Sequence, residues 1–170
     1  MRGDEMITYH KCFEIETEIR PSFHDVTGNV KKLIEDSGIR NGIVVVYSQH
    51  TTCSVIIQED SIDTTFNGTK YVFQDLLDAL EVILPECRKE GQYMHPGPKC
   101  VEHSQTMFDE DAALTLNTDA HLRSSLFGRS ESIPVVESKL QLGEHGHIYF
   151  ADFDGTRARK RTVQVQLIGE

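Results

Sequence analysis

The first residue that could take part in chemistry is a histidine between two apolar runs. His50 stands with Thr51 and Thr52 in a polar break between Gly42–Tyr47 (GIVVVY) and Ser54–Ile57 (SVII). Both runs are rich in β-branched residues, which predicts buried strands. A neutral imidazole beside the ends of such strands can bind a divalent metal or relay a proton. The alternative is a histidine that is hydrogen-bonded within the core.

A second stretch, residues 119–130, combines one imidazole, three hydroxyls and two guanidiniums. His121 is followed by Ser124 and Ser125, and then by Gly128 and Ser130. This mixture is typical of an anion site, because arginine gives bidentate contacts and the amides at a helix end supply further donors. The alternative is an ordinary capped helix with a solvated face.

A third stretch is the one basic cluster in an acidic chain, DGTRARKR at residues 154–161. On a strand, Arg157, Arg159 and Arg161 would share one face. Such a face could hold a phosphate, since guanidinium groups bind phosphate in a bidentate way. The alternative is an edge strand that is protected by charge.

The remaining histidines and cysteines give weaker patterns. His145 and His147 fall on one side of a predicted strand, a spacing that also occurs in metal-binding β-sandwiches, but no matching glutamate and histidine follow. A second conceivable zinc set has spacings that fit no tight zinc motif; it consists of Cys87, His95, Cys100 and His103. Cys53 borders the SVII run, so we expect it to be buried and inert.

Composition excludes several classes of function. The chain has 170 residues, with 17 Lys and Arg against 27 Asp and Glu, so its formal net charge is -10. This balance argues against broad nucleic-acid binding, which needs a basic footprint. There is no apolar run of the roughly 20 residues that a membrane-spanning helix needs. Without a secretory signal or a C-x-x-C pair, we expect a cytoplasmic protein whose four cysteines are reduced.

Hydrophobic periodicity predicts the elements that position these residues. We expect helices over residues 26–34, 71–84 and 117–126, the first two ended by Gly38 and Pro85, and a loop over 86–101. Further strands are expected over 13–19, 134–136, 140–142, 147–153 and 162–168, with a hairpin turn at Asp154-Gly155. The pattern favours the α+β class, as a mostly antiparallel β-sandwich with two to three flanking helices, in a single domain over residues 1–170.

Taken together, these motifs resemble the YjbQ family, also called UPF0047, whose members are often described as secondary thiamine-phosphate synthases. The matching segments follow the order of the family and span nearly the whole chain. They are QHTTCS (residues 49–54) with QED (58–60), Glu102-His103, His121 with Ser124, Ser125, Gly128 and Ser130, Leu142-Gly143, Asp154-Gly155 with Arg157 and Arg159, and the terminal Gly169-Glu170.

The resemblance implies a homotrimer whose sites lie near subunit contacts. It implies a zinc or other divalent metal site at His50, His103 and His121. It also implies an anion pocket lined by Ser124, Ser125, Gly128, Ser130 and Arg157, to which the neighbouring Thr51 and Thr52 are added. The implied activity is the condensation of a pyrimidine pyrophosphate with a thiazole phosphate.

The sequence departs from the family pattern at several positions. His145-Gly146 stands where the family has Trp-Gln, and the chain has no tryptophan. Asp152 replaces a glutamate, Thr156 replaces a proline, and the segment 87–101 is longer than is usual in the family. These changes affect the prediction of the substrate more than the prediction of the fold.

Three functions stay open on the sequence. The first is an enzyme on small phosphorylated substrates, in which a divalent metal and Arg157 neutralise a departing pyrophosphate and Glu59 or Asp154 orients a ligand or acts as a base. The second is a metal-dependent hydrolase with the same ligands. The third is a non-catalytic trimer that binds a phosphorylated metabolite.

Overall fold

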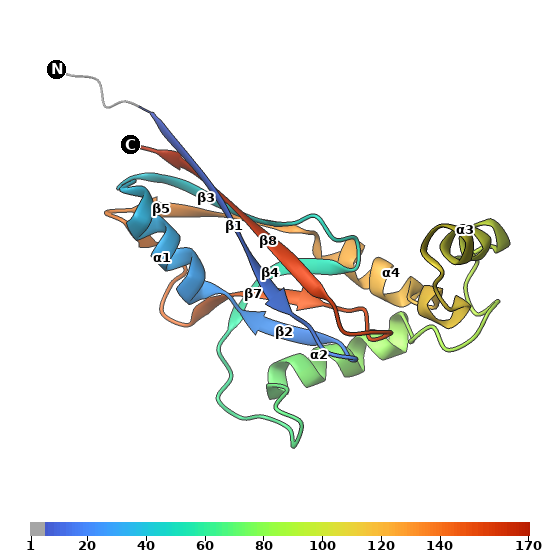
Figure 1. Ribbon diagram of the computed structural model, residues 1–170. Helices are drawn as coiled ribbons and strands as arrows, with labels where there is room; N and C mark the ends of the chain where they lie inside the picture. Colours follow the sequence, from blue (N-terminus) through green and yellow to red (C-terminus); the bar gives the residue numbers. More distant parts are fainter. Residues whose placement is uncertain (1–5) are drawn as a thin grey trace.

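Two antiparallel sheets form the body of the protein in a computed structural model that describes residues 6–170 (Figure 1). The larger sheet has the strand order β1-β8-β3-β5-β6, and the smaller has the order β2-β7-β4. The strands are β1 (Ile7–Glu16), β2 (Ser22–Asp25), β3 (Gly42–Ser48), β4 (Cys53–Glu59), β5 (Ser130–Val136), β6 (Lys139–Leu140), β7 (Gly146–Asp152) and β8 (Lys160–Gly169).

Helices flank these sheets. They are α1 (Thr27–Ser37), α2 (Tyr71–Ile83), α3 (Pro98–Phe108) and α4 (Thr118–Phe127), with a short 3-10 helix η1 at Ala112–Thr115. The α+β class with mostly antiparallel strands is therefore confirmed, with four α-helices in the described part rather than two to three. Within residues 6–170, no helix combines the length and the apolar character needed to cross a bilayer.

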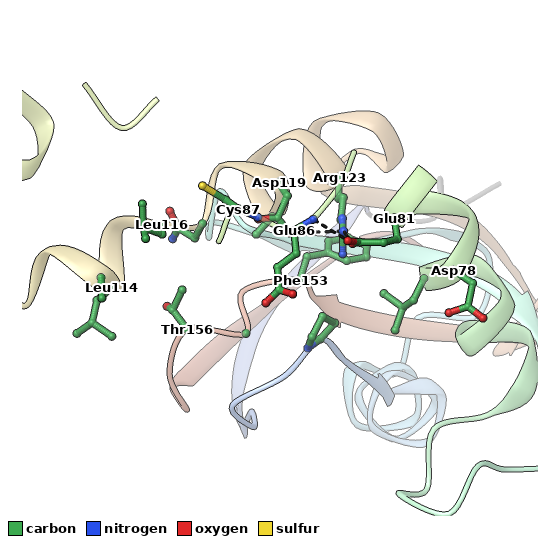
Figure 2. Close-up of a pocket in the computed structure, with 16 residues that line it drawn as sticks. Asp78, Glu81, Glu86, Cys87, Leu114, Leu116, Asp119, Arg123, Phe153 and Thr156 are labelled. Carbon is green, nitrogen blue, oxygen red and sulfur yellow. Dashed lines mark hydrogen bonds and ion pairs between the residues drawn. The ribbon is translucent and has the colours of Figure 1, made fainter. Parts of the chain in front are cut away.

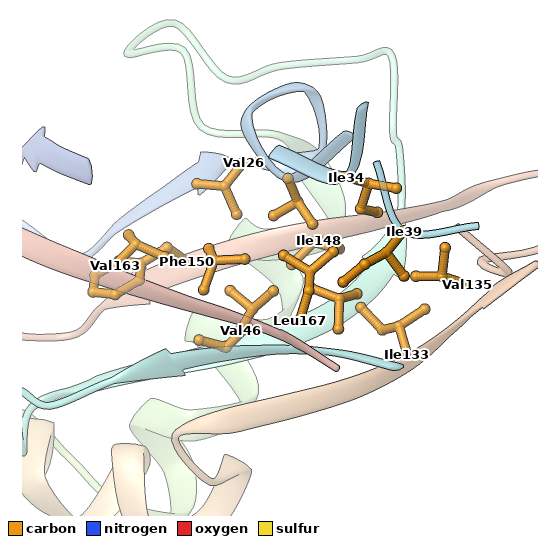
Figure 3. Packing of buried hydrophobic residues seen from close by; sticks show 14 of the residues in the cluster. Val26, Ile34, Ile39, Val46, Ile133, Val135, Ile148, Phe150, Val163 and Leu167 are labelled. Atoms are coloured by element: carbon orange, nitrogen blue, oxygen red, sulfur yellow. The ribbon is translucent and has the colours of Figure 1, made fainter. Parts of the chain in front are cut away.

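The main core lies between the two sheets (Figure 3). In β8, Val163, Val165 and Leu167 are fully buried while Gln164 and Gln166 are only partly covered, which confirms the predicted alternation. Each fully buried side chain of this size contributes roughly 1.5–3 kcal/mol. The other buried members come from α1 and from strands of both sheets, among them Val30, Ile34, Val44, Val46, Ile148 and Phe150.

Two elements were missed by the periodicity argument. The helix α3 begins at Pro98, inside the segment that we expected to be a loop. Proline and glycine suggested a break there, but proline fits the first turn of a helix, where its missing N–H is not needed. The strand β2 covers Ser22–Asp25, just before the first helix, and the carboxylate of Asp25 accepts a hydrogen bond from the backbone N–H of Thr27 at 2.9 Å.

The predicted hairpin at Asp154-Gly155 is wrong. The strands before and after it, β7 and β8, lie in different sheets and do not pair. The segment is a crossover, in which the carboxylate of Asp154 accepts hydrogen bonds from both the backbone N–H and the hydroxyl of Thr156. An aspartate-glycine pair favours a turn in either setting. This crossover carries the basic run past the junction of the two sheets.

Substitution of Gly42 tests how closely β3 and β8 approach. Gly42 faces Gly169 across the ladder, and a Cβ there would overlap the carbonyl oxygen of Ile168 and lie 2.7 Å from the Cα of Gly169. We expect Gly42→Ala to lower the free energy of unfolding by about 1–3 kcal/mol, because the strands must move apart. Urea denaturation measures this.

Gly28→Ala is the matched control for that experiment. Nothing lies within 4 Å of a Cβ at Gly28, which is in α1. Alanine should be neutral or stabilise there by about 0.5–1 kcal/mol, because glycine costs more entropy in a helix. Equal unfolding curves for the two variants would contradict the close approach of β3 and β8.

Candidate functional site

One cavity collects most of the residues that the sequence singled out. It has a volume of about 520 Å³ and lies between the turn after β3, the helix α3, the start of α4 and the crossover from β7 to β8. We call it the histidine–arginine pocket, after the groups that line it together with two carboxylates: His50, His95, His103, His121, Arg157, Arg159, Arg161, Glu110 and Asp154.

The turn that carries His50 is held by local hydrogen bonds. The hydroxyl of Ser48 accepts from the backbone N–H of His50 at 3.2 Å, and the carbonyl of His50 accepts from the N–H of Cys53 at 3.1 Å. The polar break between β3 and β4 is thus a hydrogen-bonded turn, and its residues Thr51 and Thr52 also line the pocket.

A buried ion pair supports the floor of the pocket. Arg161 and Asp152 are both buried, and the guanidinium donates to the two carboxylate oxygens at 2.8 and 3.1 Å. Arg161 also donates to the hydroxyl of Thr52 at 3.1 Å. This pair joins the start of β8 to the end of β7 and to the His50 turn, so it sets the positions of three lining segments.

Asp154 is held as an ionised carboxylate. Burial raises its pKa, but hydrogen bonds from Thr156 and Asn117 and the charge of Arg159 outweigh burial, so the pKa is lowered overall. Its oxygens lie 3.2 Å from Arg159 and 3.1 Å from the Asn117 amide nitrogen. A fully buried carboxylate with these partners positions the basic run and is poorly suited to the role of proton acceptor.

The other two arginines keep unused donors. Arg157 pairs with Glu110 at 2.6 Å. The Nε of Arg159 is buried and has no hydrogen-bond partner within residues 6–170. Burial lowers the pKa of Arg159, but a guanidinium stays charged at neutral pH. These N–H groups are available to an anion.

Two of the histidines are held in the neutral form. Burial, and then the charge of Arg161, lowers the pKa of His50. Burial, and then His95, lowers the pKa of His121. The Nε2 of His50 accepts a hydrogen bond from the backbone N–H of Thr162 at 2.9 Å, so the proton of this neutral imidazole is on Nδ1.

This arrangement does not fit a zinc ion on the three family histidines. A metal ligand needs a free lone pair, and that of His50 Nε2 is already used. Among residues 6–170, the ligand atoms of His50, His103 and His121 do not form a set within 4.8 Å of one another. The three histidines share the pocket without forming a coordination shell in this conformation.

The serines of the 119–130 stretch lie elsewhere. Ser124 is buried and donates to the carbonyl of Cys53 at 2.7 Å, which fastens α4 to β4. Ser125 donates to the carbonyl of His121 within the helix. Gly128 ends α4 with φ 82°, and Ser130 is exposed at the start of β5. The start of α4 borders the histidine–arginine pocket, whereas Ser124, Ser125, Gly128 and Ser130 are not among the residues that line it.

Glu59 is also outside the pocket. It is exposed at the far end of β4, opposite Gly146. The six residue steps along β4 from Cys53 to Glu59 correspond to about 20 Å. A role for Glu59 as a base at this pocket has no geometric support in the single chain.

His95, Glu110 and Asn117 were not assigned to this pocket from the sequence. They lie in irregular segments around α3 and η1, where no periodicity predicts a direction. The signal in the sequence was chemical, since His95 and Cys100 belong to the conceivable zinc set in and after the segment 86–101. Chemistry alone could not say which surface this segment would meet.

A second cavity of about 400 Å³ lies between α2 and α4 (Figure 2). Arg123 is buried in its wall and donates to the carbonyl of Leu84 at 2.8 Å and to Glu81 at 3.1 Å. Asp119 is also buried and lies 3.6 Å from Arg123. Arg123 was counted among possible anion ligands, and it is instead used to join the two helices.

His147 belongs to a third cluster at the edge of the smaller sheet. Its Nδ1 lies 2.8 Å from a carboxylate oxygen of Asp25, and Asp60 is the third member. Lys70 is already paired with Asp60, and the Tyr149 hydroxyl donates to the same carboxylate. His145 is exposed and is not part of the cluster.

A two-sheet α+β protein with a basic pocket at the sheet junction is the class that this geometry defines. Residues 11–170 match the family model described as UPF0047 protein YjbQ-like. The chain belongs to the YjbQ/UPF0047 family.

Relatives match over almost the whole chain. A UPF0047 protein of Methanothermobacter thermautotrophicus is 31% identical over 163 residues, which cover 96% of this chain and 95% of that protein. UPF0047 protein YugU of Bacillus subtilis is 29% identical over 159 residues, with 94% and 98% covered.

Solved structures agree. A YbjQ-like protein of unknown function from Sulfolobus solfataricus has a TM-score of 0.71 at 25% identity, with 98% of this chain and 100% of that chain covered. An uncharacterised YjbQ/UPF0047 protein from Clostridium acetobutylicum has a TM-score of 0.70 at 32% identity, with 92% and 98% covered.

Proposed function

We propose that the histidine–arginine pocket binds a small phosphorylated molecule. The observation that carries this proposal is the convergence of Arg157, Arg159 and Arg161 on one cavity of a chain with net charge -10. Arginine is the residue best suited to bidentate phosphate contacts.

The pocket is organised before a ligand arrives. Each arginine has a carboxylate partner, namely Glu110 for Arg157, Asp154 for Arg159 and Asp152 for Arg161. A guanidinium has five N–H donors, so donors on Arg157 and the buried Nε of Arg159 are left for phosphate oxygens. The N-terminal end of α4, where Asn117 lines the pocket, adds the positive end of a helix dipole.

We further propose, from the resemblance to the family, a transfer reaction of the thiamine-phosphate-synthase kind. A departing pyrophosphate leaves a pyrimidine-methyl cation, which a thiazole nitrogen attacks. Such a reaction needs charge neutralisation more than acid-base groups, and this agrees with a pocket rich in arginine whose carboxylates are already paired. The alternatives are a phosphate-ester hydrolase and a non-catalytic metabolite-binding protein.

Calorimetric titration with inorganic pyrophosphate tests the binding proposal. We expect Arg157→Ala to weaken binding at least about tenfold, because a charge-assisted hydrogen bond contributes about 1.5–3 kcal/mol. Arg129→Ala is the control, since Arg129 lies over the ring of Tyr47 and does not line the pocket. Equal losses in both variants, or no binding by the wild type, would overturn the proposal.

Product analysis separates the three functions. Purified protein is incubated either with a pyrimidine pyrophosphate plus a thiazole phosphate or with a phosphate ester alone. A condensed product supports the synthase, release of phosphate from the ester supports the hydrolase, and binding without product supports the metabolite-binding protein.

Zinc at His50, His103 and His121 stays a proposal that rests on the family resemblance. Elemental analysis of untagged protein purified without chelator measures it directly. Near-stoichiometric zinc that is lost in His121→Ala would mean that the imidazoles rearrange around the ion. Protein purified without bound metal would contradict the zinc proposal, and the proposed site would then consist of the anion pocket alone.

We also propose the homotrimer, on the basis of an apolar strip on the outer face of the larger sheet. Ile43, Tyr47 and Ile168 are exposed there, and Ile43 lies between Ile168 and Pro134 on the neighbouring strands. Burying such a strip is favourable at roughly 25 cal/mol per Å². The cytoplasmic location also remains a proposal.

Light scattering tests the trimer. We expect a mass of three times the 19.3 kDa chain for the wild type, and dissociation of the trimer in Ile43→Glu, because a charge would be buried at the contact. Val82→Glu is the control, since Val82 is an exposed apolar residue on α2. A monomeric wild type would contradict the trimer. A trimeric Ile43→Glu variant would show that the subunits contact one another through another face.

A further inference from the structure

We propose that Cys100 is a nucleophile activated by His95, and that it reacts with electrophiles that carry an anionic group. The anionic preference rests on the proposed function of the histidine–arginine pocket, which both residues line. The nucleophilic pair rests on hydrogen-bond geometry of its own.

Three side chains form a hydrogen-bonded series. The Sγ of Cys100 lies 3.9 Å from the Nε2 of His95, and the Nδ1 of His95 lies 2.9 Å from the hydroxyl oxygen of Thr118. The hydroxyl of Thr118 donates its only proton to the backbone carbonyl of His95. Its oxygen must therefore accept from Nδ1–H, which leaves the lone pair of Nε2 directed at the thiol.

This is the arrangement that thiol nucleophiles use. A cysteine lies within reach of a base, and a third group fixes the orientation and the tautomer of that base. His95 reaches the pair from the loop before α3, Cys100 lies in the first turn of α3, and Thr118 begins α4. Three separate segments thus meet at one exposed thiol.

Anion-binding groups lie close to this thiol. Cys100 and Ser104 are four residues apart on α3 and so share a face of the helix. Ser104 donates to Glu110 at 2.8 Å, and Glu110 holds Arg157 at 2.6 Å. The ring of His121 packs against His95 with a centroid distance of 5.4 Å. An anionic group at Arg157 would therefore lie in the same pocket as the thiol.

The bond changes can be written in full. The sulfur of Cys100 attacks an electrophilic carbon, its proton passes to Nε2 of His95, and the leaving group departs with the electron pair of the broken bond. With iodoacetate, an S–C bond forms, the C–I bond breaks and iodide is released. The imidazolium of His95 then returns its proton to solvent.

The chain provides its own control cysteine. Cys12 is exposed on β1, and its thiol has no hydrogen-bond partner in the described part of the chain. Cys53 and Cys87 are buried, and the thiol of Cys53 donates to Asp152 at 3.3 Å while burial raises its pKa. Two exposed cysteines with different surroundings can thus be compared within one sample.

Alkylation of the full chain at neutral pH, followed by peptide mass spectrometry, measures each cysteine separately. With iodoacetamide, we expect Cys100 to react at least about tenfold faster than Cys12, because a positioned base accelerates proton transfer. The same measurement is made with iodoacetate. The rate of alkylation by iodoacetate, divided by the rate with iodoacetamide, should be higher at Cys100 than at Cys12. His95→Gln should slow the alkylation of Cys100 and leave the alkylation rate of Cys12 unchanged.

Each failure points to a different part of the argument. Equal iodoacetamide rates at the two cysteines, or a rate at Cys100 that His95→Gln does not lower, would overturn the nucleophilic pair. Equal iodoacetate-to-iodoacetamide ratios would overturn the anionic preference. Pyrophosphate titration of the same sample then shows whether the phosphate pocket has failed as well. Thr118→Val should slow Cys100 as His95→Gln does, since it removes the acceptor for Nδ1–H.

Discussion

Asp152→Ala is expected to lower the free energy of unfolding by about 3–5 kcal/mol, because breaking a buried ion pair leaves an uncompensated charge. Asp152 is fully buried and accepts from Arg161 through both carboxylate oxygens. It also accepts from the thiol of Cys53 and from the backbone N–H of Asp154. Alanine removes four hydrogen bonds at once and leaves the buried guanidinium of Arg161 with the hydroxyl of Thr52 as a hydrogen-bond acceptor and Asp154 at 3.7 Å.

Urea denaturation and thermal unfolding measure this effect. Lys160→Ala is the control, because Lys160 is the exposed neighbour of Arg161 and faces Glu14 at 3.9 Å on the surface. A surface pair of this kind contributes at most about 1 kcal/mol. If Asp152→Ala unfolds with the same midpoint as Lys160→Ala, the pair does not support the junction of the sheets. The anion pocket would then need another source of rigidity.

Much of the fold follows from local patterns. The runs at 42–47 and 54–57 are strands, and residues 162–168 alternate as expected, because the period of a strand is visible over a few residues. The run 42–47 is buried on one face only, since Ile43 and Tyr47 are exposed. The amphipathic helix before Pro85 is also where the sequence places it. The family resemblance implied that His50 and Arg157 lie near one another, and the fold brings both to one cavity.

What could not be predicted depends on long-range placement. Asp154-Gly155 has the chemistry of a turn, but nothing local says whether the next strand returns to the same sheet or crosses to the other. The segment around α4 contains His121 and Ser124 three residues apart, yet one lines the pocket while the other is fixed to Cys53. Composition suggested an anion site in this segment, and packing decides which of its residues line the pocket.

Arg123 is another residue whose role depends on long-range packing, and its substitution is expected to have a large effect on the free energy of unfolding. We expect Arg123→Ala to cost about 3–5 kcal/mol, since it would leave Asp119 as an unpaired carboxylate within the wall of the second cavity. Arg123 is 3% exposed and Asp119 is 5% exposed. The Asp119 carboxylate forms an ion pair with Arg123 at 3.6 Å and accepts a hydrogen bond from the backbone N–H of Cys87 at 3.0 Å. The loss of Arg123 would also leave the carbonyl of Leu84 without its donor.

The pH dependence of the variant distinguishes an unpaired charge from lost packing. Burial raises the pKa of Asp119 above its usual value, although Cys87 and Arg123 act to lower it. Without Arg123 this pKa rises further. The folded variant then binds a proton that the unfolded chain releases, so its stability falls as pH rises through that window and recovers as pH falls. The deficit of Arg123→Ala relative to the wild type should therefore shrink as the pH is lowered from neutrality.

Asp119→Asn supplies the matched rescue. The asparagine carbonyl can still accept from the Cys87 N–H, but the side chain carries no charge that needs Arg123. In the background of Arg123→Ala, it should restore part of the lost free energy of unfolding and abolish the pH dependence of the deficit. A double variant that is less stable than Arg123→Ala, with an unchanged pH profile, would show that Arg123 stabilises α4 through packing and its bond to Leu84 and not through the charge of Asp119.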